Sequence, residues 1–99
     1  MKTGDTIRIG PLIYSIRLVE RLEDDNREPL NGRIRHDDCE ILIAADISPQ
    51  VQRVVLWHEV LHGILHSQGE GDDEAFVDML AHEIARVLQD NPMLAEASP

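Results

Sequence analysis

Hydrophobic and polar positions alternate along the first part of the chain. The alternation runs through 6–9 and again through 12–22, with the turn-forming pair Gly10-Pro11 between the two stretches. A period of two residues places apolar side chains on one face of a strand. We therefore expect two strands over these ranges, of which the second is long.

Two further strands are expected after a charged connection that has no periodicity. Asn31-Gly32 is a strong turn signal, and it leads into a short strand over 33–35. The run 39–44 has the apolar density of a strand that is packed on one or both faces. These segments complete a small antiparallel sheet of three or four strands.

The second half of the chain changes to helical periodicity. Ser48-Pro49 is a typical helix start, because serine can cap the first turn and proline suits the first helical position. Apolar residues then recur at helical spacing until Gly69, which is a typical stop. A second apolar stripe begins after the acidic run 72–74 and ends at Asn91-Pro92. The pattern predicts two helices.

Length and composition fit one domain of this kind. The chain has 99 residues, of which 42% are hydrophobic, so it can bury a modest and mainly aliphatic core. The predicted class is α+β, a small antiparallel sheet followed by two packed helices. We expect a single domain over 1–92 and a flexible C-terminal tail over 93–99.

The formal net charge of −10 is distributed unevenly. Residues 37–99 hold thirteen acids and only two bases, Arg53 and Arg86. Such a surface repels a phosphate backbone, so nucleic acid is not an expected partner. The acids solubilise the surface, or they attract a basic partner or a divalent cation.

Location is predicted from three features of the sequence. A single cysteine, Cys39, excludes an intrachain disulfide and fits a reducing compartment. The first residues lack the apolar core of a signal peptide, and no apolar run approaches the ~20 residues that span a bilayer. We expect a cytoplasmic protein without a membrane partner.

The chemistry is concentrated in the segment His58-Glu59-Val60-Leu61-His62, which matches H-E-x-x-H. Residues four apart on a helix differ by about 40° in azimuth and ~6 Å in height. Two imidazoles placed in this way can bind one Zn²⁺ through one nitrogen each. Glu59 points about 100° away from His58, where it can accept a proton from a metal-bound water.

A third zinc ligand must come from another element, because a catalytic site leaves one position open for water. A short connection would fold the second helix back on the first. Glu74 and Asp78 share one face of that helix, and either can supply the ligand. Asp72 and Asp73 are better explained by the preference of helix starts for acids.

The other candidate residues are weaker. His66 would lie ~12 Å along the helix axis from His58, too far to share its metal. The H-D-D-C segment at 36–39 fits turn chemistry better than metal binding. His82 or Tyr14 could stabilise an oxyanion if it faces the site.

Two segments, 54–66 and 74–81, resemble the motif helices of the ImmA/IrrE-like zinc metallopeptidases, which include short phage-encoded members, and of the small gluzincin-type minigluzincins. The resemblance covers roughly residues 30–92. It implies a zincin-like fold, and it places Glu74 at the position of the glutamate ligand of the E-x-x-A-N-x-F-A helix. Val77-Asp78 replaces the usual Ala-Asn, so Asp78 remains the alternative ligand.

Together these features predict a zinc-dependent metallopeptidase that hydrolyses a peptide bond in a cytoplasmic protein. Zinc is expected on His58, His62 and Glu74, with Glu59 as the catalytic base. An extended substrate is expected to pair with a sheet edge, for which 41–44 is the candidate. The alternative hypothesis is a catalytically silent, zinc-stabilised regulator of phage or mobile-element type that binds a protein.

Overall fold

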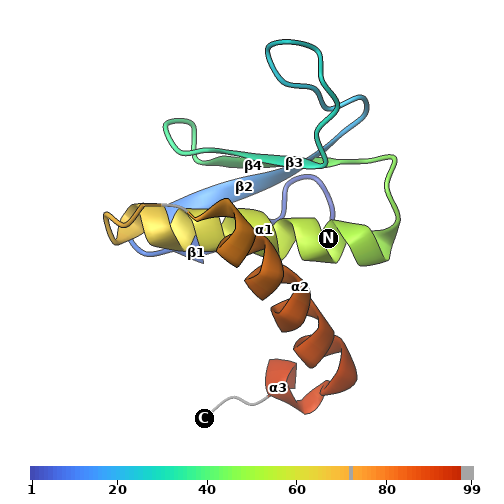
Figure 1. The fold of residues 1–99 in the computed structure, drawn as a ribbon, viewed down its shortest axis with the longest axis vertical. Helices are drawn as coiled ribbons and strands as arrows, with labels where there is room; N and C mark the ends of the chain where they lie inside the picture. The colour runs from blue at the N-terminus through green and yellow to red at the C-terminus, as the bar shows by residue number, and fades with distance from the viewer. Residues whose placement is uncertain (72, 97–99) are drawn as a thin grey trace.

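The computed structural model describes residues 1–71 and 73–96 and confirms the predicted α+β class (Figure 1). Its elements, in chain order, are β1 (Thr6–Ile9), β2 (Leu12–Val19), β3 (Gly32–Arg35), β4 (Glu40–Ala44), α1 (Pro49–Ser67), α2 (Glu74–Asp90) and α3 (Met93–Glu96). The predicted tail begins with the short helix α3. Asp72 and the end of the predicted tail, 97–99, lie outside the described residues.

The sheet has the strand order β1-β2-β4-β3 and is mixed, so the prediction of an antiparallel sheet is wrong for one pair. β1 pairs with β2 and β3 pairs with β4 in antiparallel fashion, whereas β2 and β4 run parallel. The connection 20–31 reverses the chain direction, so β3 runs antiparallel to β2. It also leaves the width of one strand between β2 and β3. The β3–β4 hairpin then places β4 in this space. Because β4 is antiparallel to β3, it runs parallel to β2.

The second strand is shorter than its alternation predicts. β2 ends at Val19, because Arg21 adopts a positive φ of 54° that turns the chain away from the sheet. Leu22 is nevertheless buried, since it packs with Leu42 and Ala44 in a small cluster beside the main core. The apolar residue at the end of the predicted strand therefore contributes to packing without belonging to the strand.

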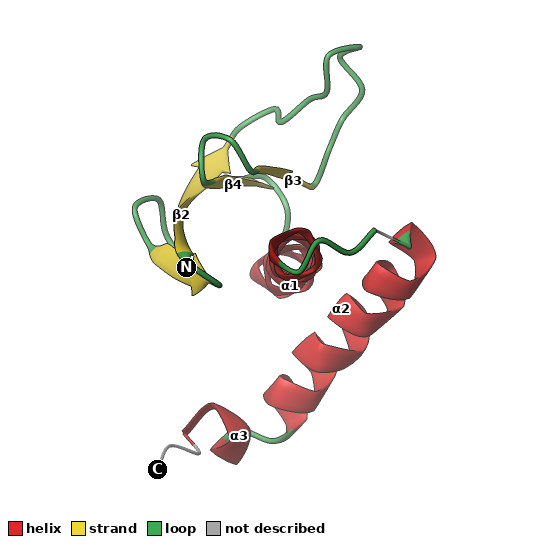
Figure 2. Cartoon of the chain, turned by 90° about the vertical axis from the view of Figure 1, so that its left-hand side faces the viewer, coloured by secondary structure: helices red, strands yellow, loops and turns green. Residues whose placement is uncertain are grey.

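Helix α1 covers the inner face of the sheet, and α2 packs on α1. Figure 2 shows the sheet curving around α1, while α2 passes α1 on another side. Alternate residues of β2 point into the core, which explains why Tyr14 and Ile16 are buried whereas Ser15 is exposed. The buried residues of the main core are Ile9, Tyr14, Ile16, Ile41, Ile43 and Val60.

Local chemistry determines where α1 starts and ends and where α2 starts, as the sequence predicts. Ser48 Oγ accepts a hydrogen bond of 3.3 Å from the Val51 amide, and α1 begins at the next residue, Pro49. Gly69 adopts a φ of 71° just after α1 ends. Asp73 caps α2 by accepting from the Phe76 amide at 3.1 Å. Over the described residues, neither α1 nor any other helix combines the length and apolar character needed to cross a membrane.

Candidate metal centre

His58 and His62 lie one turn apart on α1, as the motif predicts, and their rings converge. Their Nε2 atoms are 3.1 Å apart. The side chain of His62 is 8% exposed and that of His58 is 22% exposed, so both rings are largely shielded from solvent. The four-residue spacing on a helix therefore brings the two Nε2 atoms close enough to bind one metal ion.

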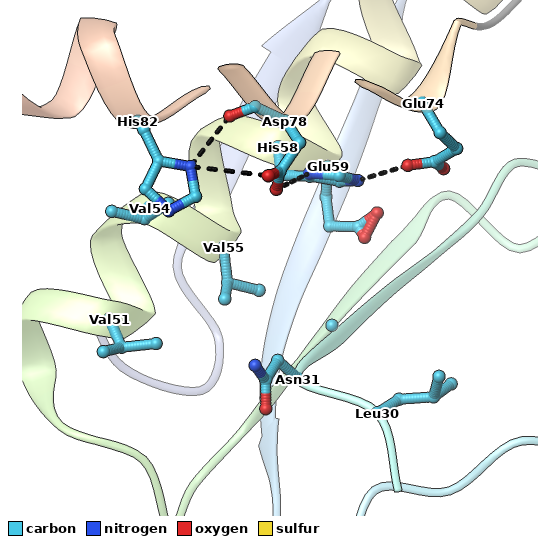
Figure 3. Close-up of a pocket in the computed structure, with 11 residues that line it drawn as sticks. Leu30, Asn31, Val51, Val54, Val55, His58, Glu59, Glu74, Asp78 and His82 are labelled. Carbon is cyan, nitrogen blue, oxygen red and sulfur yellow. Dashed lines mark hydrogen bonds and ion pairs between the residues drawn. The ribbon is translucent and has the colours of Figure 1, made fainter. Parts of the chain in front are cut away.

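Glu74 reaches the same point from the start of α2. One carboxylate oxygen, Oε1, lies 2.9 Å from Nε2 of His62, and the other, Oε2, lies 3.2 Å from Nε2 of His58. The Asp73 cap fixes the first turn of α2, and thereby the position from which Glu74 extends. Figure 3 shows Glu74 directed at His58 at one end of a cavity.

The close approach of the two Nε2 atoms fits a metal ion better than it fits a hydrogen bond. An uncharged ring nitrogen either donates or accepts, so His62 Nε2 cannot donate to Glu74 and also accept from His58. A cation between the atoms would instead take a lone pair from each. Ligand atoms in a tetrahedral zinc site with bonds of 2.0–2.1 Å are about 3.3 Å apart. The observed separations of 3.1, 3.2 and 2.9 Å are close to that value.

Asp78 contacts the other nitrogen of the His58 ring. Its Oδ1 lies 3.4 Å from Nδ1 of His58, and its Oδ2 lies 3.8 Å from Nδ1 of His82. A carboxylate on the distal nitrogen of a metal-binding histidine orients the ring and increases its basicity. The two acids considered as third ligand therefore occupy different positions, with Glu74 on the Nε2 atoms and Asp78 behind the ring.

Glu59 belongs to the same group of side chains. It is 6% exposed, and one potential ligand atom from each of His58, Glu59 and His62 lies within 4.8 Å of the others. This cluster can hold a metal ion. β3 closely approaches Glu59, because a Cβ built on Gly32 would lie 3.4 Å from its Oε2 atom. A carboxylate enclosed in this way beside two imidazoles could transfer a proton at a bound metal ion.

A cavity of about 400 Å³ lies in front of these groups. Figure 3 shows apolar side chains along its wall, with His82 and Asp78 near the candidate ligands. Its lining residues are Leu30, Asn31, Gly32, Val51, Val54, Val55, His58, Glu59, Glu74, Asp78 and His82. The cavity can therefore accept an apolar group next to the candidate metal.

Tyr14 and His82, the two residues predicted as alternative oxyanion stabilisers, have different positions. His82 lines the cavity, whereas Tyr14 is 1% exposed and packs in the core. Burial raises the pKa of the Tyr14 hydroxyl above 10.0, and the charge of Cys39 adds to that shift. The Tyr14 hydroxyl is 3.1 Å from Nδ1 of His36, so that ring links it to the site.

His36 is a residue whose place at the site the sequence did not indicate. It lines a shallow hollow together with Glu59, His62 and Glu74. Its ring stacks on that of His66, with centroids 3.8 Å apart and an interplanar angle of 8°. The pairing joins the turn after β3 to the end of α1, a contact across thirty residues that no local pattern predicts.

The sheet edge next to the site is β3, and the prediction of a free edge at 41–44 is wrong. β4 pairs with β2 on one side and with β3 on the other. Within the described sheet, β3 has only β4 as a neighbour. The edge strand near the candidate metal centre is therefore β3, which begins at Gly32, directly beside Glu59.

Comparison with protein-family models, with curated proteins and with solved structures gave no match for this chain. The resemblance to the ImmA/IrrE-like metallopeptidases remains a prediction from two sequence segments. Independently of that resemblance, the structure contains a cluster of two histidines and a glutamate, His58, His62 and Glu59, that could hold a metal ion.

Proposed function

We propose that this protein is a zinc-dependent metallopeptidase that hydrolyses a peptide bond in a cytoplasmic protein. The observation that supports this most strongly is the convergence of two ring nitrogens and one carboxylate. The Nε2 atoms of His58 and His62 are 3.1 Å apart, and each lies 3.2 or 2.9 Å from one oxygen of Glu74. Two imidazoles and one carboxylate are a common ligand set of catalytic zinc, and three protein ligands leave a position open for water.

Each nearby residue has a role in the proposed reaction. His58, His62 and Glu74 hold the ion, and Asp78 orients the His58 ring through its Nδ1 atom. Bound zinc supplies Lewis acidity, which makes water a better nucleophile and polarises a carbonyl group. Glu59 accepts the proton of the attacking water and transfers it to the leaving amine. A purely structural metal site would not need that carboxylate.

Two histidines are placed to stabilise negative charge on the reacting carbonyl oxygen. His82 lines the main cavity and His36 lines the neighbouring hollow. The buried Tyr14 hydroxyl forms a hydrogen bond of 3.1 Å with Nδ1 of His36, and burial raises its pKa, so the hydroxyl keeps its proton at neutral pH. In the tautomer whose Nδ1 accepts from the Tyr14 hydroxyl, a neutral His36 ring carries its proton on Nε2.

The outer edge of β3 is the proposed site for an extended substrate. A peptide that adds to a sheet edge gains main-chain hydrogen bonds, and adjacent pockets then select its side chains. β3 begins at Gly32, beside Glu59, and the cavity next to it is lined by Val51, Val54 and Val55. Peptide binding at β3 would place the scissile bond near the ligand cluster.

A second candidate function, a zinc-stabilised protein-binding regulator, is favoured by the exposed apolar residues of α2. Phe76 is 55% exposed and Met79 is 49% exposed, although both lie on a helix whose inner face packs on α1. Exposed apolar side chains grouped on one element are a feature of protein-binding surfaces. This function would need zinc for stability but would not need Glu59 as a base.

Hydrolysis by zinc-loaded protein distinguishes the two functions. The substrate would be a mixture of proteome-derived peptides, and new amino termini would be labelled and identified by mass spectrometry. The peptidase proposal predicts new termini with the wild type and at least about a 100-fold loss with Glu59→Gln, which removes the base. Equal amounts from both proteins, at equal zinc content, would contradict it.

A further inference from the structure

A second cavity adjoins the first one, and none of the proposed zinc ligands lines it. Its volume is about 550 Å³, and it lies between the first half of α1 and the second half of α2. Val54 and His82 line both cavities, so the two are neighbours. The remaining residues of its lining are Gln50, Arg53, Glu83, Ala85, Arg86, Gln89 and Asp90.

Both bases of residues 37–99, Arg53 and Arg86, line this one cavity. Glu83 and Asp90 lie three and four residues from Arg86, at spacings that favour ion pairs on a helix. Yet in the described part of the chain neither arginine forms an ion pair, whereas Arg17, Arg33 and Arg35 do. The two guanidinium groups are therefore available to a ligand.

We propose that this second cavity is a substrate subsite in which Arg53 and Arg86 bind a carboxylate of the peptide. The inference rests on the proposed peptidase function. Guanidinium groups bind carboxylates through paired, charge-assisted hydrogen bonds, which give both geometry and selectivity. The carboxylate can belong to an Asp or Glu side chain or to the carboxyl terminus of the peptide.

Helix geometry gives the distance of this subsite from the scissile bond. Arg53 precedes His58 by five residues on α1, an axial separation of about 7.5 Å. Arg86 follows Asp78 by eight residues on α2, which corresponds to about 12 Å. An extended peptide rises about 3.3 Å per residue, so the bound carboxylate belongs two to four residues from the scissile bond.

The inference also explains how an acidic protein can accept an acidic segment. The chain carries a net charge of −10, which repels acidic peptides in general. Arg53 and Arg86 balance Glu83 and Asp90 within the cavity, so the local formal charge is zero with His82 neutral. Binding there would depend on placing the carboxylate at the two arginines, which favours specificity over long-range attraction.

The test is an NMR titration of ¹⁵N-labelled Glu59→Gln protein in zinc-containing buffer, because this variant leaves the peptides intact. Three peptides of one apolar sequence are compared. The first has glutamate at the third position from its centre and an amidated carboxyl terminus. The second has glutamine in place of that glutamate. The third has the glutamine and a free carboxyl terminus.

We expect the glutamate peptide to bind about five- to tenfold more tightly than the amidated glutamine peptide, with shifts at Gln50, Arg53, Arg86 and Gln89. The double variant Arg53→Gln/Arg86→Gln should remove this preference, and Arg8→Gln, at an exposed arginine on β1, should keep it. A preference shown by the third peptide instead would identify the terminal carboxylate as the ligand.

Equal binding of all three peptides, no carboxylate-dependent shift at these residues, or a preference that survives in the double variant would overturn the inference. Binding and cleavage together distinguish failure of this inference from failure of the peptidase proposal. A protein that binds the acidic peptide at Arg53 and Arg86 but cleaves nothing keeps the subsite and loses the catalytic role. A protein that cleaves without any carboxylate preference does the reverse.

Discussion

Oε1 of Glu74 lies 2.9 Å from Nε2 of His62, although the two residues belong to different helices. α2 packs on α1 and not on the sheet, and among its described residues only Val77 and Ala81 are buried. A metal ion bound by both helices would therefore link α2 to the rest of the domain. Metal binding and helix packing would then be coupled.

Removal of zinc is accordingly expected to destabilise α2 before the sheet. At a free zinc concentration 1,000 times the dissociation constant, binding to the native state contributes about 4 kcal/mol to the free energy of unfolding. We expect a chelator to lower the thermal midpoint and to accelerate amide exchange more in α2 than in β2 and β4. Hydrogen exchange with and without chelator measures this, and equal exchange in both states would contradict the coupling.

Glu74→Ala should weaken zinc binding more than Asp78→Ala. Glu74 contacts both Nε2 atoms, whereas Asp78 contacts only the distal nitrogen of His58. Loss of a residue that holds a metal-binding histidine through its distal nitrogen typically costs 10–100-fold in metal affinity. Loss of a direct ligand should cost more. Competition with a fluorescent chelator gives both affinities. The opposite order would make Asp78 the third ligand.

Gly32→Ala should destabilise the domain by about 1–3 kcal/mol, because it overpacks a contact between β3 and α1. The added Cβ would collide with Cγ1 of Val55, a β-branched residue with few rotamers on a helix. Urea denaturation measures the loss. Gly71→Ala is the matched control, since a Cβ there meets no atom within 4 Å. Similar midpoints for the two variants would refute the close approach.

Tyr14→Phe should change the stability of the protein at alkaline pH. The pKa of Tyr14 is raised above 10.0 by burial and then by Cys39, so above that pH the native state retains a proton that the unfolded chain loses. The free energy of unfolding therefore falls as pH rises through that range. Urea midpoints between about pH 9 and 11 should fall less in Tyr14→Phe than in the wild type. Parallel pH profiles would contradict the assignment.

Features that depend on local chemistry could be predicted from the sequence. Ser48 caps α1 and Asp73 caps α2 through hydrogen bonds within the first turn of each helix, so the local sequence is enough to indicate both helix starts. The convergence of His58 and His62 follows from the helical period. Turn chemistry likewise predicted Gly10, which adopts a φ of 58° between β1 and β2.

Features that depend on strand order and helix crossing could not be predicted. The run 41–44 is apolar at every position because β4 is an inner strand with a parallel neighbour, and the same pattern is compatible with an edge strand. Glu74 and Asp78 lie one turn apart on the same face of α2, so the crossing of the helices decides which reaches the Nε2 atoms. The stacking of His36 on His66 depends on both the sheet and α1.

The central claim is that His58, His62 and Glu74 hold one zinc ion. Its most direct test is the metal content of protein purified without added zinc, measured by mass spectrometry beside a His62→Ala variant. The account predicts about one zinc per folded chain and almost none in the variant. A wild type that binds no zinc even when zinc is supplied, or equal zinc in both proteins, would contradict it.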